Sequence, residues 1–336
     1  MAASAKRYNL GNDIQNSAPD TRVELTRVGV TGLKRMLRLK RGPGRGNALF
    51  FAEMDMFARL SSERSGVHMS RFIENIEDVA SSMASESAPD IETLGERMAL
   101  AIARTQGTER AEIRIRAQFP MKRRAPISRA EVEDLYTFVG IAVSDGRLSG
   151  RVIGVEATGL TVCPCAMEMV TEQNREALAV AGYSREQVDE ISSLVTFASH
   201  NQRGKATLLI GTQTPIRAEE LAEIAEGSMS SEIYELLKRP DELHVVNRAH
   251  SRPRFAEDVV REMIRGVSVN FAHLADDTFV LARQENFESI HAHCAYAERC
   301  GLLGNMRDEL EGKTKRASVS RARASSLESW LDSLLQ

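Results

Sequence analysis

Two cysteines one residue apart, in Cys163-Pro164-Cys165, are well suited to chemistry in this chain of 336 residues. They follow an apolar, β-branched run from Val152 to Val162 that is typical of a strand. Proline fits poorly inside a helix or a central strand, so we expect both sulfurs to project from a bend at the end of that strand. A thiolate displayed in this way serves as a metal ligand or as a nucleophile.

Three histidines form a second group of candidates. His200 opens a polar stretch before a predicted strand, and His291 and His293 flank Ala292 after an apolar stretch. Residues two apart on an extended chain share a face, so these two imidazoles can approach one small site together. A structural role for the histidines is the alternative, and the spacing alone leaves both open.

Two glutamates complete the candidates. Glu242 follows Arg239-Pro240-Asp241 on what we expect to be a loop, where a solvated charge is the simpler interpretation. Glu257 lies near the start of a predicted helix, where its simplest role is to complement the helix dipole.

Composition narrows the possible functions. A net charge of −3 gives no sign of nucleic-acid binding, and no run of 18 apolar residues or signal peptide suggests a membrane partner. Four cysteines in a chain of this length do not make a disulfide framework. We therefore expect a cytoplasmic protein whose thiols are free to bind metal.

The elements that position these residues follow a repeated order. The periodicity predicts strand-strand-helix-helix-strand-strand twice, with the join near residue 140. The first unit has strands near 23–25 and 52–60, helices at 72–83 and 91–102, and strands at 111–119 and 136–143. The second has strands at 152–162 and 206–210, helices at 221–236 and 255–267, and strands at 267–273 and 279–290. This order predicts an α+β fold with antiparallel sheets, helices on one face, and another copy covering the other face in a closed oligomer.

The same pass gives the expected domain organisation. Residues 1–20 form a polar N-terminal arm, 21–140 the first module, and 141–312 the second module with a helical insertion at 167–198. Residues 313–336 form a tail that is basic and serine-rich at first and amphipathic near its end. Because the basic run is short and lacks interleaved aromatics, we expect a surface or subunit-contact role for the tail rather than nucleic-acid binding.

Several short motifs occur together and in order along the chain. They are Asp13-Ile14-Gln15, Gly66-Val67-His68-Met69-Ser70-Arg71, Cys163-Pro164-Cys165, His200-Asn201-Gln202-Arg203-Gly204, Arg239-Pro240-Asp241-Glu242, Phe255-Ala256-Glu257-Asp258 and Glu288-Ser289-Ile290-His291-Ala292-His293. This ordered set resembles the type IB GTP cyclohydrolases from about residue 12 to 300. The helical insertion between Cys163 and His200 resembles the archaeal, methanopterin-pathway branch more than the bacterial folate branch.

The resemblance implies a fold and a site. The family fold is the tunnelling fold, or T-fold, with two tandem ββααββ modules per subunit. Carried over residue by residue, the metal ligands are Cys163, His200 and Glu242, Glu257 holds the guanine edge, and Cys163, His291 and His293 are catalytic. A mixed set of sulfur, nitrogen and oxygen ligands suits one divalent metal per subunit, Fe²⁺ first, with Zn²⁺ or Mn²⁺ also possible. The implied partners are GTP, water and further copies of the chain, as a dimer or tetramer with sites near subunit interfaces.

The implied activity is that of a GTP cyclohydrolase, a hydrolase acting on cyclic amidine C–N bonds. It opens the guanine imidazole ring at C8, releases formate and recloses the product to 7,8-dihydroneopterin 2′,3′-cyclic phosphate, the first step of tetrahydromethanopterin biosynthesis. One alternative is the bacterial-type product, 7,8-dihydroneopterin triphosphate, for folate. Another is a non-catalytic metal-binding protein on the same scaffold.

Overall fold

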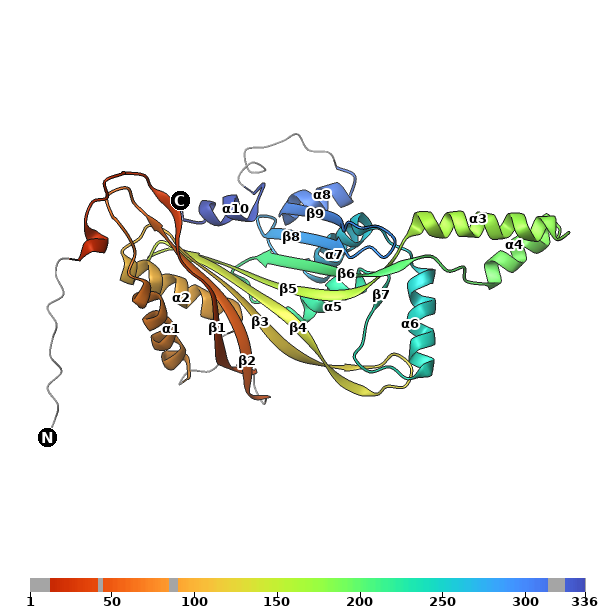
Figure 1. The fold of residues 1–336 in the computed structure, drawn as a ribbon, viewed down its shortest axis with the longest axis horizontal. Coiled ribbons are helices and arrows are strands. Elements are labelled where there is room, and N and C mark those ends of the chain that lie inside the picture. The colour runs from red at the N-terminus through yellow and green to blue at the C-terminus, as the bar shows by residue number, and fades with distance from the viewer. Residues whose placement is uncertain (1–12, 42–44, 85–89, 314–323, 336) are drawn as a thin grey trace.

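One long antiparallel sheet carries the whole chain. The computed structural model describes residues 13–41, 45–84, 90–313 and 324–335 (Figure 1). Within them the sheet has nine strands in the order β1-β2-β3-β4-β5-β6-β8-β9, and β7 pairs with β5. The centre of the sheet is the β4–β5 hairpin, where Ser144 pairs with Ser149 across the predicted Asp145-Gly146 turn. The two halves of the chain therefore share one continuous sheet.

The first half has the predicted order of elements. After the short 3-10 helix η1 (Ile14–Asn16), the strands are β1 (Leu25–Arg41), β2 (Arg45–Leu60), β3 (Ala111–Arg124) and β4 (Glu131–Ser144), and the helices are α1 (Met69–Ala84) and α2 (Ile91–Gln106). The Asp90 side chain caps α2 by accepting from the Thr93 amide at 3.0 Å, and Gly107 ends the helix in the left-handed conformation.

The second half departs from the prediction in three places. Its strands are β5 (Ser149–Val162), β6 (Asn201–Gly211), β7 (Ser231–Glu232), β8 (Phe279–Asn286) and β9 (Ala295–Leu302), and its helices are α3 (Pro164–Val180), α4 (Arg185–Leu194), α5 (Ala218–Gly227), α6 (Arg239–Ser251), α7 (Ala256–Asn270), α8 (Leu303–Leu310) and α10 (Leu327–Ser333). The strand predicted at 267–273 is wrong, because α7 continues to Asn270 and the closing strands are β8 and β9. The helix predicted at 221–236 is too long, because α5 ends at Gly227 and β7 pairs with β5 inside the predicted range. Helix α6 was not predicted.

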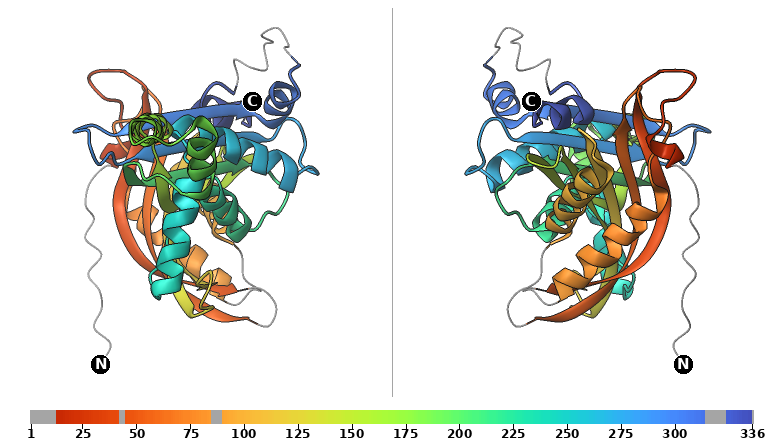
Figure 2. Two further views of the ribbon diagram at one scale, coloured as in Figure 1. Left: turned by 90° about the vertical axis from the view of Figure 1, so that its right-hand side faces the viewer. Right: turned by 90° about the vertical axis from the view of Figure 1, so that its left-hand side faces the viewer.

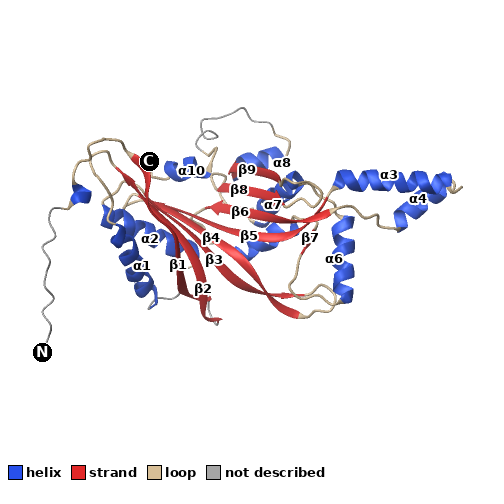
Figure 3. Ribbon diagram, viewed as in Figure 1, coloured by secondary structure: helices blue, strands red, loops and turns tan. Residues whose placement is uncertain are grey.

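Helices α1, α2, α5 and α7 cover one face of the sheet (Figures 2 and 3). The large core on this face includes Met98 of α2, Leu221 of α5 and Met263 of α7, each with no exposed surface. Helices α3 and α4 instead extend away from the sheet (Figure 1). Val188 of α4 is the only buried residue of these two helices.

Helix α10 covers part of the opposite face. A second apolar cluster joins Leu327, Trp330 and Leu331 to sheet residues of β4, β5, β6 and β8. Trp330 stacks on Phe279 with ring centroids 5.2 Å apart, and its ring lies over Gly211, where a Cβ atom would come within 2.2 Å of it. The amphipathic end of the tail thus packs on its own chain, although we expected a surface or subunit-contact role. The basic part from 314 to 323 lies outside the described residues.

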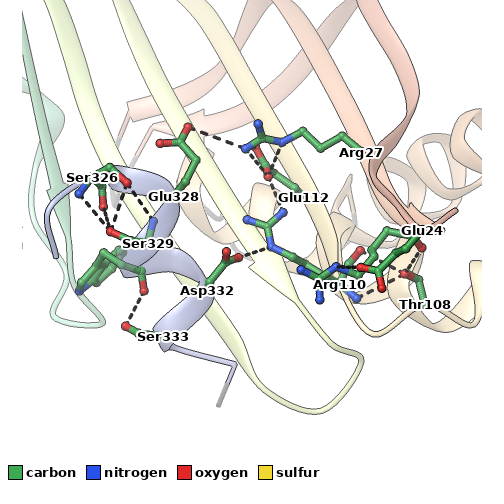
Figure 4. A network of polar contacts seen from close by, with 12 residues as sticks. Glu24, Arg27, Thr108, Arg110, Glu112, Ser326, Glu328, Ser329, Asp332 and Ser333 are labelled. Carbon is green, nitrogen blue, oxygen red and sulfur yellow. Dashed lines mark hydrogen bonds and ion pairs between the residues drawn. The ribbon is translucent and has the colours of Figure 1, made fainter. Parts of the chain in front are cut away.

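A buried ionic network fixes α10 in place (Figure 4). The fully buried carboxylate of Glu112 accepts hydrogen bonds from Arg27, Arg110 and Arg114. Arg110 also donates to Asp332 at 2.6 Å, and Arg114 to Glu328 at 3.1 Å. Burial alone would raise the pKa of Glu112, but the neighbouring arginines hold it below its ordinary value.

Among the described residues, no helix is long and apolar enough to cross a membrane.

Candidate active site

Cys163 lies where β5 ends and α3 begins. It is the N-cap residue of α3, and its Sγ accepts a hydrogen bond from the Ala166 amide at 3.5 Å. Pro164 is the first residue of the helix, a position where its missing N–H costs nothing. The predicted bend is therefore a strand-to-helix junction, and Cys165 lies inside the first helical turn rather than in the bend. The free amides of a helix N-terminus suit an anionic group such as a thiolate.

His200 lies directly beside Cys163. Strands β5 and β6 pair as far as Val162 and Asn201, and the Cys163 amide donates to the His200 carbonyl at 3.3 Å. The Ser199 hydroxyl donates to the Cys163 carbonyl at 3.1 Å. Helices α3 and α4 therefore leave and return to the sheet at one point, and the two predicted ligands stand at that point.

His291 and His293 join this group from the loop after β8. The His291 ring centroid lies 6.5 Å from that of His200 and 5.1 Å from that of His293. Cys163, His200 and these two histidines, which we call the histidine cluster, thus come together at one end of the neighbouring strands β5, β6 and β8. The predicted grouping of His291 and His293 near one site agrees with this geometry.

Two residues that sequence reasoning missed hold His200. Its Nδ1 lies 3.4 Å from the Ser289 hydroxyl and 4.0 Å from a Glu288 carboxylate oxygen. The other oxygen of Glu288 accepts from Gln202 at 3.4 Å, and Gln202 also donates to Thr161 at 3.1 Å. A carboxylate at Nδ1 leaves Nε2 of the imidazole free to bind a metal. The signal available in the sequence was the position of Glu288 three residues before His291.

Glu242 lies in the first turn of α6 and not on the expected loop. Its side chain is exposed. The other end of α6 lies beside the histidine cluster, because His250 Nε2 lies 3.2 Å from the carbonyl oxygen of Ser199, the residue before His200. The sequence separation of eight from Glu242 to His250 corresponds to about 12 Å of helix. Within the described part of this chain, no three His, Cys, Asp or Glu side chains converge closely enough to hold a metal ion.

Glu257 is the second residue of α7, and the start of this helix is tied to β5. The Arg254 amide donates to the carbonyl of Val162 at 3.0 Å, next to Cys163. The Glu257 side chain is exposed and lines a cavity of about 480 Å³ with Arg261 and the apolar Val260. The arrangement offers a carboxylate above an apolar wall, which suits the edge of a flat heterocycle.

The two upstream motifs also meet each other. The Gly66 amide donates to the Gln15 carbonyl at 3.1 Å, and His68 Nε2 lies 3.3 Å from the Asp13 carboxylate. This pair precedes α1, and α1 and α3 lie at opposite ends of the molecule (Figure 1). In one chain the motifs therefore form two separate groups.

The donor chemistry of the histidine cluster fits a transition metal. Thiolate and imidazole are ligands that Fe²⁺ and Zn²⁺ accept and that Mg²⁺ does not favour. All four cysteines of the chain are free. The structure brings Cys163 and His200 together and leaves Glu242 apart from them.

This chain is similar to known proteins both in sequence and in fold. Residues 12–297 match the family described as type I GTP cyclohydrolase folE2. The chain is 40% identical over 306 residues to GTP cyclohydrolase MptA of Methanothermobacter thermautotrophicus, covering 89% of this chain and 96% of that protein. It is 38% identical over 305 residues to GTP cyclohydrolase MptA of Methanocaldococcus jannaschii, covering 89% and 97%. Among solved structures, uricase from Arthrobacter globiformis superposes with a TM-score of 0.50 at 10% identity, covering 87% of this chain and 95% of uricase.

Proposed function

Because this chain belongs to the type I GTP cyclohydrolase family, we propose that it opens the imidazole ring of GTP in the first step of tetrahydromethanopterin biosynthesis. One water molecule adds at C8 of guanine and opens the ring to a formamide, and a second water molecule hydrolyses the formamide, so that both C–N bonds to C8 break and C8 leaves as formate. The remaining diaminopyrimidine recloses with the ribose carbons to a dihydropterin. The observation that carries this proposal is the pairing of Cys163 with His200 beside His291 and His293.

The product we propose is 7,8-dihydroneopterin 2′,3′-cyclic phosphate. A cyclic monophosphate keeps one of the three phosphorus atoms of GTP, so the other two must leave as pyrophosphate. The alternative product, 7,8-dihydroneopterin triphosphate, keeps all three. Pyrophosphate release therefore separates the two reactions without a standard of either pterin.

We assign Cys163, His200 and Glu242 as the ligands of one divalent metal ion, Fe²⁺ in preference to Zn²⁺ or Mn²⁺. The adjacency of Cys163 and His200 supports the first two, and the support for Glu242 is its motif alone. When bound, such an ion lowers the pKa of a water molecule toward neutrality and so supplies the nucleophile. Glu288 and Ser289 hold His200 at Nδ1.

The remaining site residues act on the substrate. His291 and His293 move protons to and from the purine nitrogens and the leaving formate. Glu257 accepts from N1–H and the 2-amino group of guanine at once. Adenine lacks both donors, so this carboxylate selects GTP over ATP on the order of 10⁴-fold.

We also propose that the chain has the tunnelling fold, with modules at 21–140 and 141–312, and assembles into a cytoplasmic homo-oligomer. The repeated order of strands and helices supports the fold. The separation of the motifs into two groups at opposite ends supports sites shared between copies. The four free cysteines agree with a reducing compartment.

The decisive experiment incubates metal-loaded protein with GTP and measures formate, pyrophosphate and product mass. We expect one formate and one pyrophosphate per GTP and a product carrying a single phosphate. Formate without pyrophosphate establishes the triphosphate product instead. A metal-loaded protein that releases no formate overturns the cyclohydrolase proposal in favour of a non-catalytic metal-binding protein.

A further inference from the structure

The β3–β4 hairpin extends past its neighbours in the sheet. The β2–β3 ladder ends at the pair Phe51–Gln118, and the β4–β5 ladder ends at Thr137–Glu156. Residues 119–136 therefore continue as a two-stranded ribbon, which is marginally stable without other support. This ribbon reaches the N-terminal end of α6 (Figure 3).

Asp241 makes the contact at the ribbon tip. One of its carboxylate oxygens accepts from the amides of Ile127 and Ser128, both at 2.8 Å, and the other accepts from the Lys238 amide at 2.9 Å. Asp241 has no exposed surface, so its charge depends on these donors. Burial alone would raise the pKa of Asp241, but the hydrogen bonds from Ser128, Lys238 and Ile127 outweigh it and lower the pKa well below its ordinary value.

The ribbon stem holds the segment that leads to α6. Arg123 of the stem donates to Glu226 of α5 at 2.7 Å and stacks over the Tyr234 ring at 4.5 Å. The Glu235 amide donates to the Asp134 carboxylate at 3.2 Å. The first half of the chain thus holds residues 234–241 of the second half at both the stem and the tip.

The next residue, Glu242, has no such support of its own. Its side chain is exposed, so its position depends on the first turn of α6. The first amides of a helix have no partners within the helix, and a turn that loses its cap frays. At Asp241 the cap is shared with the ribbon tip.

We propose that Asp241 is a positioning residue for Glu242, and that it acts by tying the first turn of α6 to the tip of the β3–β4 hairpin. The inference rests on the proposed role of Glu242. In this arrangement the β3–β4 hairpin of the first half of the chain positions Glu242, a proposed ligand that belongs to the second half. Small displacements of a ligand matter, since about 1 Å of misplacement at a site can cost on the order of 100-fold in rate.

Two variants break the tie from opposite sides. Asp241→Asn puts an NH₂ group against at least one of the three amide donors. Ser128→Pro removes the Ser128 amide that donates to Asp241, and it does not alter the sequence of α6. The matched control is Arg124→Ala, which removes an exposed ion pair with Glu131 on the same ribbon. Glu242→Gln reports on the proposed ligand itself.

The first measurement needs no substrate. Hydrogen exchange in the metal-free full chain should become at least 10-fold faster at the amides of residues 238, 239 and 241–243 in Asp241→Asn and Ser128→Pro, and should stay unchanged in Arg124→Ala. The second uses the visible absorption of the Co²⁺-loaded protein, whose bands should shift in the first two variants and not in the control. In turnover, kcat per folded molecule should fall about 10- to 100-fold, with KM for GTP changed less than threefold.

The outcomes separate two kinds of failure. If Glu242→Gln loses turnover while Asp241→Asn and Ser128→Pro keep wild-type kcat and Co²⁺ spectra per folded molecule, Asp241 is only structural and the inference is wrong. If Glu242→Gln itself keeps full turnover and metal content, the assignment of Glu242 fails and the positioning role fails with it. Formate release from GTP by the wild-type protein tests the reaction independently of both.

Discussion

Glu92 is a buried acid whose replacement should stabilise the protein in a pH-dependent way. It lies in the first turn of α2, is 3% exposed, and its Oε2 has no hydrogen-bond partner among the described residues. Burial, together with the smaller effect of the Asp90 carboxylate, raises the pKa of Glu92 from 4.5 to about 8. At neutral pH the folded protein therefore holds a proton on Glu92 that the unfolded chain has released.

The sign and size of the effect follow from this difference in pKa. Because the folded state binds the extra proton, the stabilising contribution is complete below pH 4.5 and is lost as the pH rises through about 8. At about 1.4 kcal/mol for each pKa unit, the loss amounts to roughly 5 kcal/mol. Glu92→Gln carries a neutral group of the same shape and avoids it. The variant should gain least at pH 5.5 and most of that amount at pH 9.

The assay is urea unfolding of wild type and Glu92→Gln at one protein concentration, at pH 5.5, 7 and 9. The control is Glu186→Gln, an exposed first-turn glutamate of α4, for which the difference in unfolding free energy should stay constant from pH 5.5 to 9. A difference between wild type and Glu92→Gln that does not grow with pH would refute the reasoning.

Four further outcomes are expected. Trp330→Ala should lower the unfolding free energy by about 3–5 kcal/mol in urea unfolding, because it empties the contact between α10 and the sheet, whereas Val180→Ala at an exposed position should change it by less than about 0.5 kcal/mol. Cys163→Ala should abolish turnover and most metal content, and Cys165→Ala should do less; equal metal and activity in the two variants contradict the ligand assignment. Air should inactivate the Fe²⁺ form, and anaerobic loading with Fe²⁺ should give more activity than loading with Zn²⁺. Full activity of an aerobically purified zinc form would contradict this prediction. Glu257→Gln should bind metal normally and lose most GTP turnover, since an amide accepts from only one of the two guanine donors; lost metal or unchanged turnover places guanine elsewhere.

The sheet was the most predictable part of the fold. In β3, apolar Ile113 and Ile115 alternate with Arg114 and Arg116, and alternation of this kind has no helical counterpart. The error at 267–273 shows where the argument fails. Val267 and Phe271 are buried and Val269 is exposed, so the buried apolar residues are four positions apart. Residues four apart share a face in a helix and also in a strand, so this spacing does not separate the two structures.

Helix α6 could not be recognised from periodicity. Leu243 and Val246 are exposed in this chain, and the buried positions include Asp241, whose polar side chain is satisfied by a distant hairpin. No sequence pattern reveals such a partner. The C-terminal helix was recognised as amphipathic, but an apolar stripe does not say whether its own chain or another copy covers it.

The grouping of the candidate site residues could be predicted in part from the sequence, but their assembly required the fold. The spacing of His291 and His293 already indicated a shared site, and the structure adds His200 and Cys163 to it. The role of Glu288 required the fold, because its contact with His200 joins loops that are distant in the sequence.

The helical arm of α3 and α4 begins and ends at adjacent points of one ladder, where the Cys163 amide meets the His200 carbonyl at 3.3 Å. A segment that connects two such points can change in length without moving either of them. The loop-closure entropy of a longer connection costs little, about 0.6 kcal/mol for each doubling of its length. The arm is therefore a permissive place for insertion. A tight turn, a reporter domain or a longer pair of helices could replace it, while the strands beneath keep the same pairing.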